Sequence, residues 1–153
     1  YIFKNHLKSF PNDILICVGP NEDEKIVSKL MKIKNCFYFS FSKNISNFYR
    51  LSDLFIMPSF REGFGSAVIE ASACGLPVIA SDIPGLQDSV RKNVTGLLIP
   101  SQDKEGFIKG LEFFRDPANY KKFSLQSRSY ICKNFRQENV VKRFLDFLKA
   151  IEI

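Results

Sequence analysis

The segment Pro58–Gly75, which reads PSFREGFGSAVIEASACG, decides how the chain folds. A short apolar run, Asp53–Met57, comes directly before it, and a second apolar run, Leu76–Ala80, comes directly after it. Such runs favour buried strands, whereas the residues between them begin as a glycine-containing loop and continue as good helix formers. The segment therefore predicts a strand, a loop, a helix and a second strand in succession.

The loop and the start of the predicted helix carry residues suited to a sugar nucleotide. Gly63 and Gly65 allow the backbone to approach a ligand closely, and Ser66 is a predicted N-cap that leaves the next amides free to face an anion. Glu62 and Glu70 bracket this turn, and carboxylates accept hydrogen bonds from pairs of sugar hydroxyls. The bracket predicts a ligand with sugar, phosphate and sugar in succession. The alternative is an ordinary strand–loop–helix unit with one surface glutamate and one helix glutamate.

The rest of the chain alternates in the same way. Strands are predicted at Asp13–Val18, Asn35–Phe41, Asp53–Met57, Pro77–Ser81 and Thr95–Ile99. Helices are predicted up to Ser9, from Asn21 or Glu22 to Ile33, and at Asn44–Leu51, Ser66–Cys74, Leu86–Arg91, Gln102–Phe114, 118–134 and 137–151. This alternation predicts an α/β fold, a Rossmann-like parallel sheet with helices on both faces. In such sheets the ligand binds beyond the carboxyl ends of the strands.

The run Pro58–Gly85 resembles the signature of retaining glycosyltransferases of family 4, the glycosyl transferases group 1 domain. The family pattern is Pro-Ser, Glu-Gly-Phe-Gly, a second Glu eight residues after the first, and then Ala-x-Gly-x-Pro-Val. The residues that match in register are Glu62, Gly63, Phe64, Gly65, Glu70, Gly75, Pro77 and Val78. Thr95–Ile99 also resembles the family's Thr-Gly-Leu-Leu-Val strand, and Leu15–Gly19 resembles its second strand.

This resemblance implies the C-terminal, donor-binding half of a GT-B enzyme, in which two Rossmann-like halves enclose the active site. Residues 1–153 are then one nucleotide-sugar-binding domain that ends in helices at about 118–151. Relative to the family pattern, the chain lacks the first, normally central strand of this half. It also lacks the N-terminal half that holds the acceptor. We therefore expect a fragment that is poorly active by itself and that has its own N-terminal half as a partner.

The resemblance also implies roles for individual residues. The implied donor-binding residues are Glu62, Gly63, Phe64, Gly65, Ser66, Ala67, Glu70, Phe41 and Ser42. Glu62 is the implied catalytic residue, in contact with the hydroxyls of the donor hexose, and Glu70 holds the ribose hydroxyls. Backbone amides from Phe64 to Ala67 approach the diphosphate or the sugar. Phe41 and Ser42 lie near the base.

Composition limits the remaining functions. The chain has a net charge of +6 but no clustered basic run, so we expect attraction to phosphates, nucleotides or anionic lipid and no nucleic-acid binding. No Asp-x-Asp pair is present, which favours a metal-independent reaction without cofactors. The four scattered cysteines and the single histidine, His6, predict no zinc site, reduced core thiols and a structural or exposed imidazole. The expected location is the cytoplasm, including the inner face of the membrane.

The overall expectation is transfer of a hexose from a nucleoside-diphosphate sugar, by default a UDP-sugar, to a glycan or lipid-linked acceptor in bacterial capsule or lipopolysaccharide synthesis. Two alternatives stay open. One is a sugar-nucleotide epimerase of the same fold, and the other is a non-catalytic nucleotide-sugar-binding domain. A dehydrogenase is disfavoured because no G-x-G-x-x-G follows the predicted strand Asp13–Val18.

Overall fold

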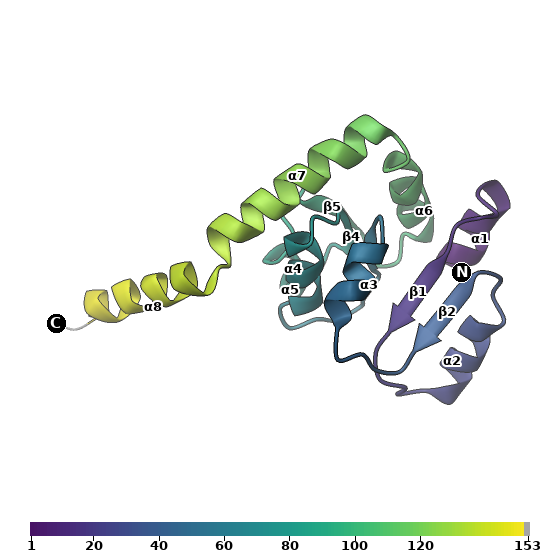
Figure 1. Cartoon of the computed structure of the whole chain (residues 1–153), viewed down its shortest axis with the longest axis horizontal. Helices are drawn as coiled ribbons and strands as arrows, with labels where there is room; N and C mark the ends of the chain where they lie inside the picture. The colour runs from purple at the N-terminus through teal and green to yellow at the C-terminus, as the bar shows by residue number, and fades with distance from the viewer. Residues whose placement is uncertain (152–153) are drawn as a thin grey trace.

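The computed structural model describes residues 1–151 as an α/β protein in which helices flank parallel strands (Figure 1). The strands are β1 (Leu15–Val18), β2 (Cys36–Phe39), β3 (Phe55–Met57), β4 (Val78–Ser81) and β5 (Gly96–Ile99). The helices are α1 (Ile2–Ser9), α2 (Glu24–Met31), α3 (Ile45–Leu51), α4 (Ser66–Ala73), α5 (Pro84–Gln87), α6 (Lys104–Phe113), α7 (Pro117–Asn134) and α8 (Gln137–Ile151). The predicted fold class and the predicted order of elements are confirmed.

The strands form two parallel sheets where the sequence predicted one. β1 pairs with β2, and β4 lies between β3 and β5. The doubly wound fold has the strand order 3-2-1-4-5-6. The order β2-β1 followed by β3-β4-β5 matches positions 3-2 and 4-5-6 of that fold, and position 1 has no strand in residues 1–151. Among residues 1–151, therefore, one edge of β1 and one edge of β3 have no strand partner. This division accounts for the partial exposure of β1 and β3, whereas every residue of β4 is buried.

The core is built on the two faces of β4, because alternate residues of a strand point to opposite faces. Val78 and Ala80 pack on one face with a cluster that consists of Val68, Leu86, Val90 and Leu98. Ile79 points to the other face and packs with Phe107, Phe114 and Phe123. Helices α4 and α5 therefore cover one face of this sheet. Helix α6 and Phe123 of α7 cover the other, and α7 also packs against α4.

Several element boundaries differ from the predictions for local reasons. Helix α2 begins at Glu24 because the Asp23 carboxylate accepts hydrogen bonds from the Lys25 and Ile26 amides. The predicted bounds of the helix Leu86–Arg91 are wrong, since α5 begins at Pro84 and ends at Gln87. The fixed φ of proline suits a first helical position. Helix α7 begins at Pro117, one residue before the predicted start, and the Asp116 side chain caps it.

The expectation of four core thiols is also wrong in part. Cys36 is buried and Cys17 and Cys132 are half-buried, but Cys74 is exposed because it is the C-cap of α4 instead of a residue on its packed face. All four are free thiols. Among residues 1–151, no group of three or more His, Cys, Asp or Glu side chains could hold a metal ion.

His6 has a structural role, as predicted. It is buried, and its Nε2 lies 2.8 Å from Oδ2 of Asp13, the same oxygen that accepts a 2.8 Å hydrogen bond from Nη1 of Arg115. Partial burial by itself would raise the pKa of Asp13, but the hydrogen bonds from His6 and Arg115 and the Arg115 charge outweigh it and lower that pKa. This cluster joins α1 and the residues just before β1 to Arg115, which lies between α6 and α7.

Asp13→Asn is expected to lower the free energy of unfolding by about 1 kcal/mol near neutral pH, because the pairing charge is lost. Because the pKa of Asp13 is lowered in the folded protein, its carboxylate contributes fully to stability at pH values above its ordinary pKa of 3.8. This contribution is lost as the pH falls through the lowered pKa. Urea unfolding of both proteins should therefore differ at pH 7 and converge well below pH 3.8. An equal difference at both pH values would contradict the assignment.

The C-terminal helices lie along and beyond the core. In Figure 1, α7 crosses above α4 and β5, and α8 extends away from the sheets. No side chain of α8, residues 137–151, is buried, and its large exposed apolar side chains are Val140, Val141, Phe144, Leu145, Phe147 and Ile151. In the part of the chain that the structure describes, no helix combines the length and the apolar character that crossing a membrane requires.

Candidate functional site

The loop between β3 and α4 ends in an unusual helix start. Gly65 is the N-cap of α4 and has left-handed backbone angles, φ 69° and ψ 49°, which favour glycine. Ser66 is therefore not the N-cap that the sequence predicted but the first residue of the helix, and within residues 1–151 no side chain caps this end. The first amides of a helix have no intrahelical acceptor and carry the positive end of its dipole. This end of α4 is suited to an anion.

Two glycines allow this loop to pack tightly against α5. A Cβ on Gly65 would lie 2.5 Å from Cδ2 of Leu86. A Cβ on Gly85, in α5, would overlap the carbonyl oxygen of Glu62 and lie 2.7 Å from that of Gly63. The backbone that carries Glu62 therefore rests directly on α5. This contact fixes the position of the loop relative to the sheet.

Each of the two predicted glutamates accepts a hydrogen bond from one hydroxyl. Oε1 of Glu62, a half-buried residue, accepts from Oγ of Ser59 at 2.8 Å. Oε2 of Glu70, an exposed residue, accepts from the phenol of Tyr49 at 3.1 Å. Tyr49 is only 7% exposed, and its burial, followed by the nearby Glu70 carboxylate, raises the pKa of the phenol. The phenol is therefore protonated at ordinary pH and donates to Glu70.

The other predicted donor-binding residues are placed differently. Phe64 is 45% exposed, and its ring lies 6.0 Å from that of Phe135, which follows α7. Phe41 and Ser42 lie between β2 and α3, and Phe41 is largely exposed. Oγ of Ser42 accepts a hydrogen bond from the Asn44 amide. Within residues 1–151 neither of them has a hydrogen bond or ring contact with the Pro58–Gly75 segment.

Gly63, Gly65, Ser66 and Ala67 do lie with Glu62 and Glu70 on the one loop–helix unit. Tyr49 and Phe135 were not predicted as neighbours of this unit. Nothing local in the sequence marks these two, since each comes from a distant part of the chain. Ser59 follows β3 and is the serine of the Pro-Ser pair that opens the motif.

The family assignment follows from comparison with known proteins. Residues 3–130 match the family described as glycosyl transferases group 1, which is most of the chain and includes the whole candidate site. The chain belongs to the glycosyl transferases group 1 family. The predicted family is confirmed.

Relatives of this group 1 domain are longer proteins. The UDP-Gal:alpha-D-GlcNAc-diphosphoundecaprenol alpha-1,3-galactosyltransferase of Escherichia coli is 32% identical over 100% of this chain, which spans 39% of that protein. Sucrose-phosphate synthase from Thermosynechococcus elongatus has a similar fold, with a TM-score of 0.83, 24% identity, and coverage of 98% of this chain and 41% of that one. Anabaena Alr3699/HepE, solved in complex with UDP-glucose, gives a TM-score of 0.81, 20% identity, and coverage of 98% and 44%. The chain thus spans less than half of each of these three proteins.

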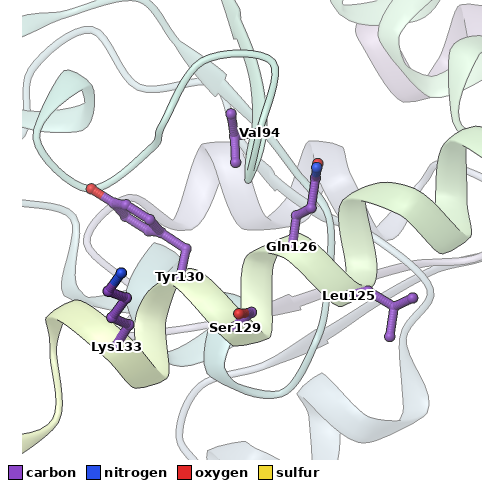
Figure 2. A pocket seen from close by; sticks show the side chains of 6 residues that line it. All are labelled: Val94, Leu125, Gln126, Ser129, Tyr130 and Lys133. Atoms are coloured by element: carbon purple, nitrogen blue, oxygen red, sulfur yellow. The ribbon is translucent and has the colours of Figure 1, made fainter.

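The group 1 domain has two surface hollows that are not lined by residues of the Pro58–Gly75 segment. Figure 2 shows the first, of about 420 Å³, which is lined by Val94, Leu125, Gln126, Ser129, Tyr130 and Lys133. Val94 precedes β5, so this hollow lies at the amino end of that strand. The second, of about 360 Å³, is lined by Lys4, Leu7, Lys29, Lys32, Ile33 and Lys34. Three of these lysines lie at the end of α2, where cations stabilise the negative end of a helix dipole.

Proposed function

We propose that the chain is the donor-binding half of a retaining glycosyltransferase that transfers a hexose from a nucleoside-diphosphate sugar, by default a UDP-sugar. One observation carries this proposal: Glu62 and Glu70, each with a hydroxyl donor, bracket the uncapped N-terminus of α4. Carboxylates suit sugar hydroxyls and a helix N-terminus suits a diphosphate. The family assignment and the UDP-glucose complex of Anabaena Alr3699/HepE support the same class of ligand.

In this proposal, the two glutamates have different roles. Glu62 contacts the hexose and is the catalytic residue, because a carboxylate near the anomeric carbon stabilises a positively charged transition state. Glu70 holds the ribose hydroxyls. The diphosphate lies at the amides of Gly65, Ser66 and Ala67, where the dipole of α4 stabilises the leaving group without a metal ion or another cofactor.

The acceptor belongs to the rest of the protein in this proposal. The strand edges of β1 and β3 that have no partner in residues 1–151, and the exposed apolar side chains of α8, are surfaces suited to a further strand and an N-terminal half. A two-halved enzyme would hold the acceptor opposite the donor site. The 39% span of the Escherichia coli relative is consistent with a longer protein of this kind.

The same relative supports a proposal for the acceptor class, because its name specifies a diphosphoundecaprenol-linked sugar. We infer a glycan or lipid-linked acceptor and a place in bacterial capsule or lipopolysaccharide synthesis. The matching location is the cytoplasm, including the inner face of the membrane. A sugar-nucleotide epimerase remains the second candidate, and analysis of products separates the two, because only a transferase forms a new glycosidic bond.

The proposal is tested by calorimetry on the full-length protein with EDTA present. UDP or a UDP-sugar is expected to bind, because the helix dipole and the glutamates need no metal ion to hold it. GDP and ADP serve as controls for the base. An absence of heat for all three nucleotides would overturn the donor-site proposal. Tighter binding of GDP or ADP than of UDP would show that the donor carries guanine or adenine instead of uracil.

A further inference from the structure

We propose that Tyr49 and Ser59 are positioning residues, and that each fixes one glutamate so that a single carboxylate oxygen is presented to the donor. The proposal rests on the proposed function of Glu62 and Glu70. The Tyr49 hydroxyl donates to Oε2 of Glu70, and the Ser59 hydroxyl donates to Oε1 of Glu62. In the described residues, no other hydrogen bond reaches either carboxylate. Oε1 of Glu70 and Oε2 of Glu62 are therefore available to a ligand.

Tyr49 is itself held rigidly. Its side chain is 7% exposed and belongs to a cluster with Ala71 and Leu76. The ring of Phe55, in β3, meets it edge-on at 5.8 Å with an interplanar angle of 77°. The phenol oxygen thus has one position relative to α4, whereas Glu70 is exposed and would otherwise sample several rotamers.

Ser59 acts within the loop. Its hydroxyl reaches three residues ahead to Glu62, which is the span of a local turn closed by a side chain. The backbone of Glu62 rests on Gly85, so the main chain and the carboxylate of this residue are each fixed by one contact. An ionised carboxylate only accepts hydrogen bonds, so in both pairs the hydroxyl is the donor.

The Tyr49–Glu70 pair and the Ser59–Glu62 pair should affect different kinetic quantities, because Glu70 is assigned to the ribose and Glu62 to the hexose. A ribose contact is made about equally in the ground state and the transition state, so its loss raises KM. Tyr49→Phe removes only the hydroxyl and is expected to weaken UDP binding about tenfold, with kcat at saturating donor nearly unchanged. Ser59→Ala is expected to lower kcat about tenfold, with UDP affinity nearly unchanged.

The experiment measures UDP affinity and sugar-transfer kinetics on the full-length protein. Matched controls are Tyr38→Phe, which removes a phenol that donates to the Gly19 carbonyl at 2.8 Å, and Ser52→Ala, which removes a hydroxyl that donates to the Phe48 carbonyl at 2.8 Å. Neither control contacts the two glutamates, and both are expected to retain UDP affinity and kcat. Ser59→Thr keeps the hydroxyl and should restore the rate that Ser59→Ala loses.

A double-mutant cycle separates positioning from general stability. If Tyr49 acts through Glu70, then Tyr49→Phe should have almost no effect on UDP affinity in a Glu70→Ala background. Additive losses in this cycle would overturn the inference, as would equal losses in Tyr49→Phe and Tyr38→Phe. If the unaltered protein binds no UDP, the proposed function itself fails. If the unaltered protein binds UDP and Tyr49→Phe binds it equally well, only the positioning role fails.

Discussion

Gly85→Ala is expected to lower the rate of sugar transfer by about a hundredfold or more. The added Cβ would overlap the Glu62 carbonyl oxygen and lie 2.7 Å from the Glu62 carbonyl carbon and from the Gly63 oxygen. These are backbone atoms that no side-chain rotation can move, so the loop or α5 must shift by about an ångström, a displacement that can cost about a hundredfold in rate.

The measurement combines the transfer rate, UDP affinity and thermal unfolding of the full-length variant. Gly110→Ala is the matched control, since it also adds a Cβ to a buried helical glycine, but its nearest neighbours are side-chain atoms of Ile79 at 3.2 Å or more and not backbone atoms. We expect Gly110→Ala to keep its transfer rate. A folded Gly85→Ala protein with an unaltered rate would show that the loop does not depend on its contact with α5.

Glu62→Gln is expected to lower kcat about tenfold or more, which corresponds to about 1.4 kcal/mol. Glutamine keeps the size of the side chain and an oxygen that can accept the Ser59 hydrogen bond. It removes the negative charge that stabilises an oxocarbenium-like transition state and that strengthens hydrogen bonds to the hexose hydroxyls. UDP has no hexose, so its affinity should remain nearly unchanged.

This prediction requires the UDP affinity and the transfer rate to be measured on the same full-length variant. If UDP affinity collapses, Glu62 holds the loop or the nucleotide, and its assignment to the donor sugar is wrong. A rate close to that of the unaltered protein would equally remove Glu62 from the chemistry. Comparison with Ser59→Ala is informative, because that variant keeps the charge and loses only its fixed position.

The sequence predicted the features that depend on local pattern. The alternation of strands and helices followed from apolar periodicity, and Glu62, Gly65 and Glu70 were identified from the spacing of one motif. The first residue of α4 was predicted, but its N-cap was missed by one residue, because a serine is usually the better N-cap and nothing local shows that Gly65 adopts left-handed angles. Propensity also cannot show that a side chain at Gly65 would meet Leu86.

The features that were missed depend on contacts between distant elements. The hydrogen bond from Tyr49 to Glu70 joins α3 to α4, and the contact of Phe64 with Phe135 joins the loop to the end of α7. The overlap that forbids a side chain at Gly85 joins α5 to the β3–α4 loop. The division of the strands into two sheets was also missed, because apolar runs predict strands without their partners.

The strand edges of β1 and β3 have a consequence for how this segment behaves in solution. An edge without a partner presents a row of backbone donors and acceptors, and any extended chain of suitable length can pair with it. The apolar side chains of β1 and β3 are half-buried, so such pairing would also remove hydrophobic surface from water. With these edges uncovered, the chain would therefore tend to aggregate by adding strands from neighbouring copies. Its solubility depends on whether those two edges are covered.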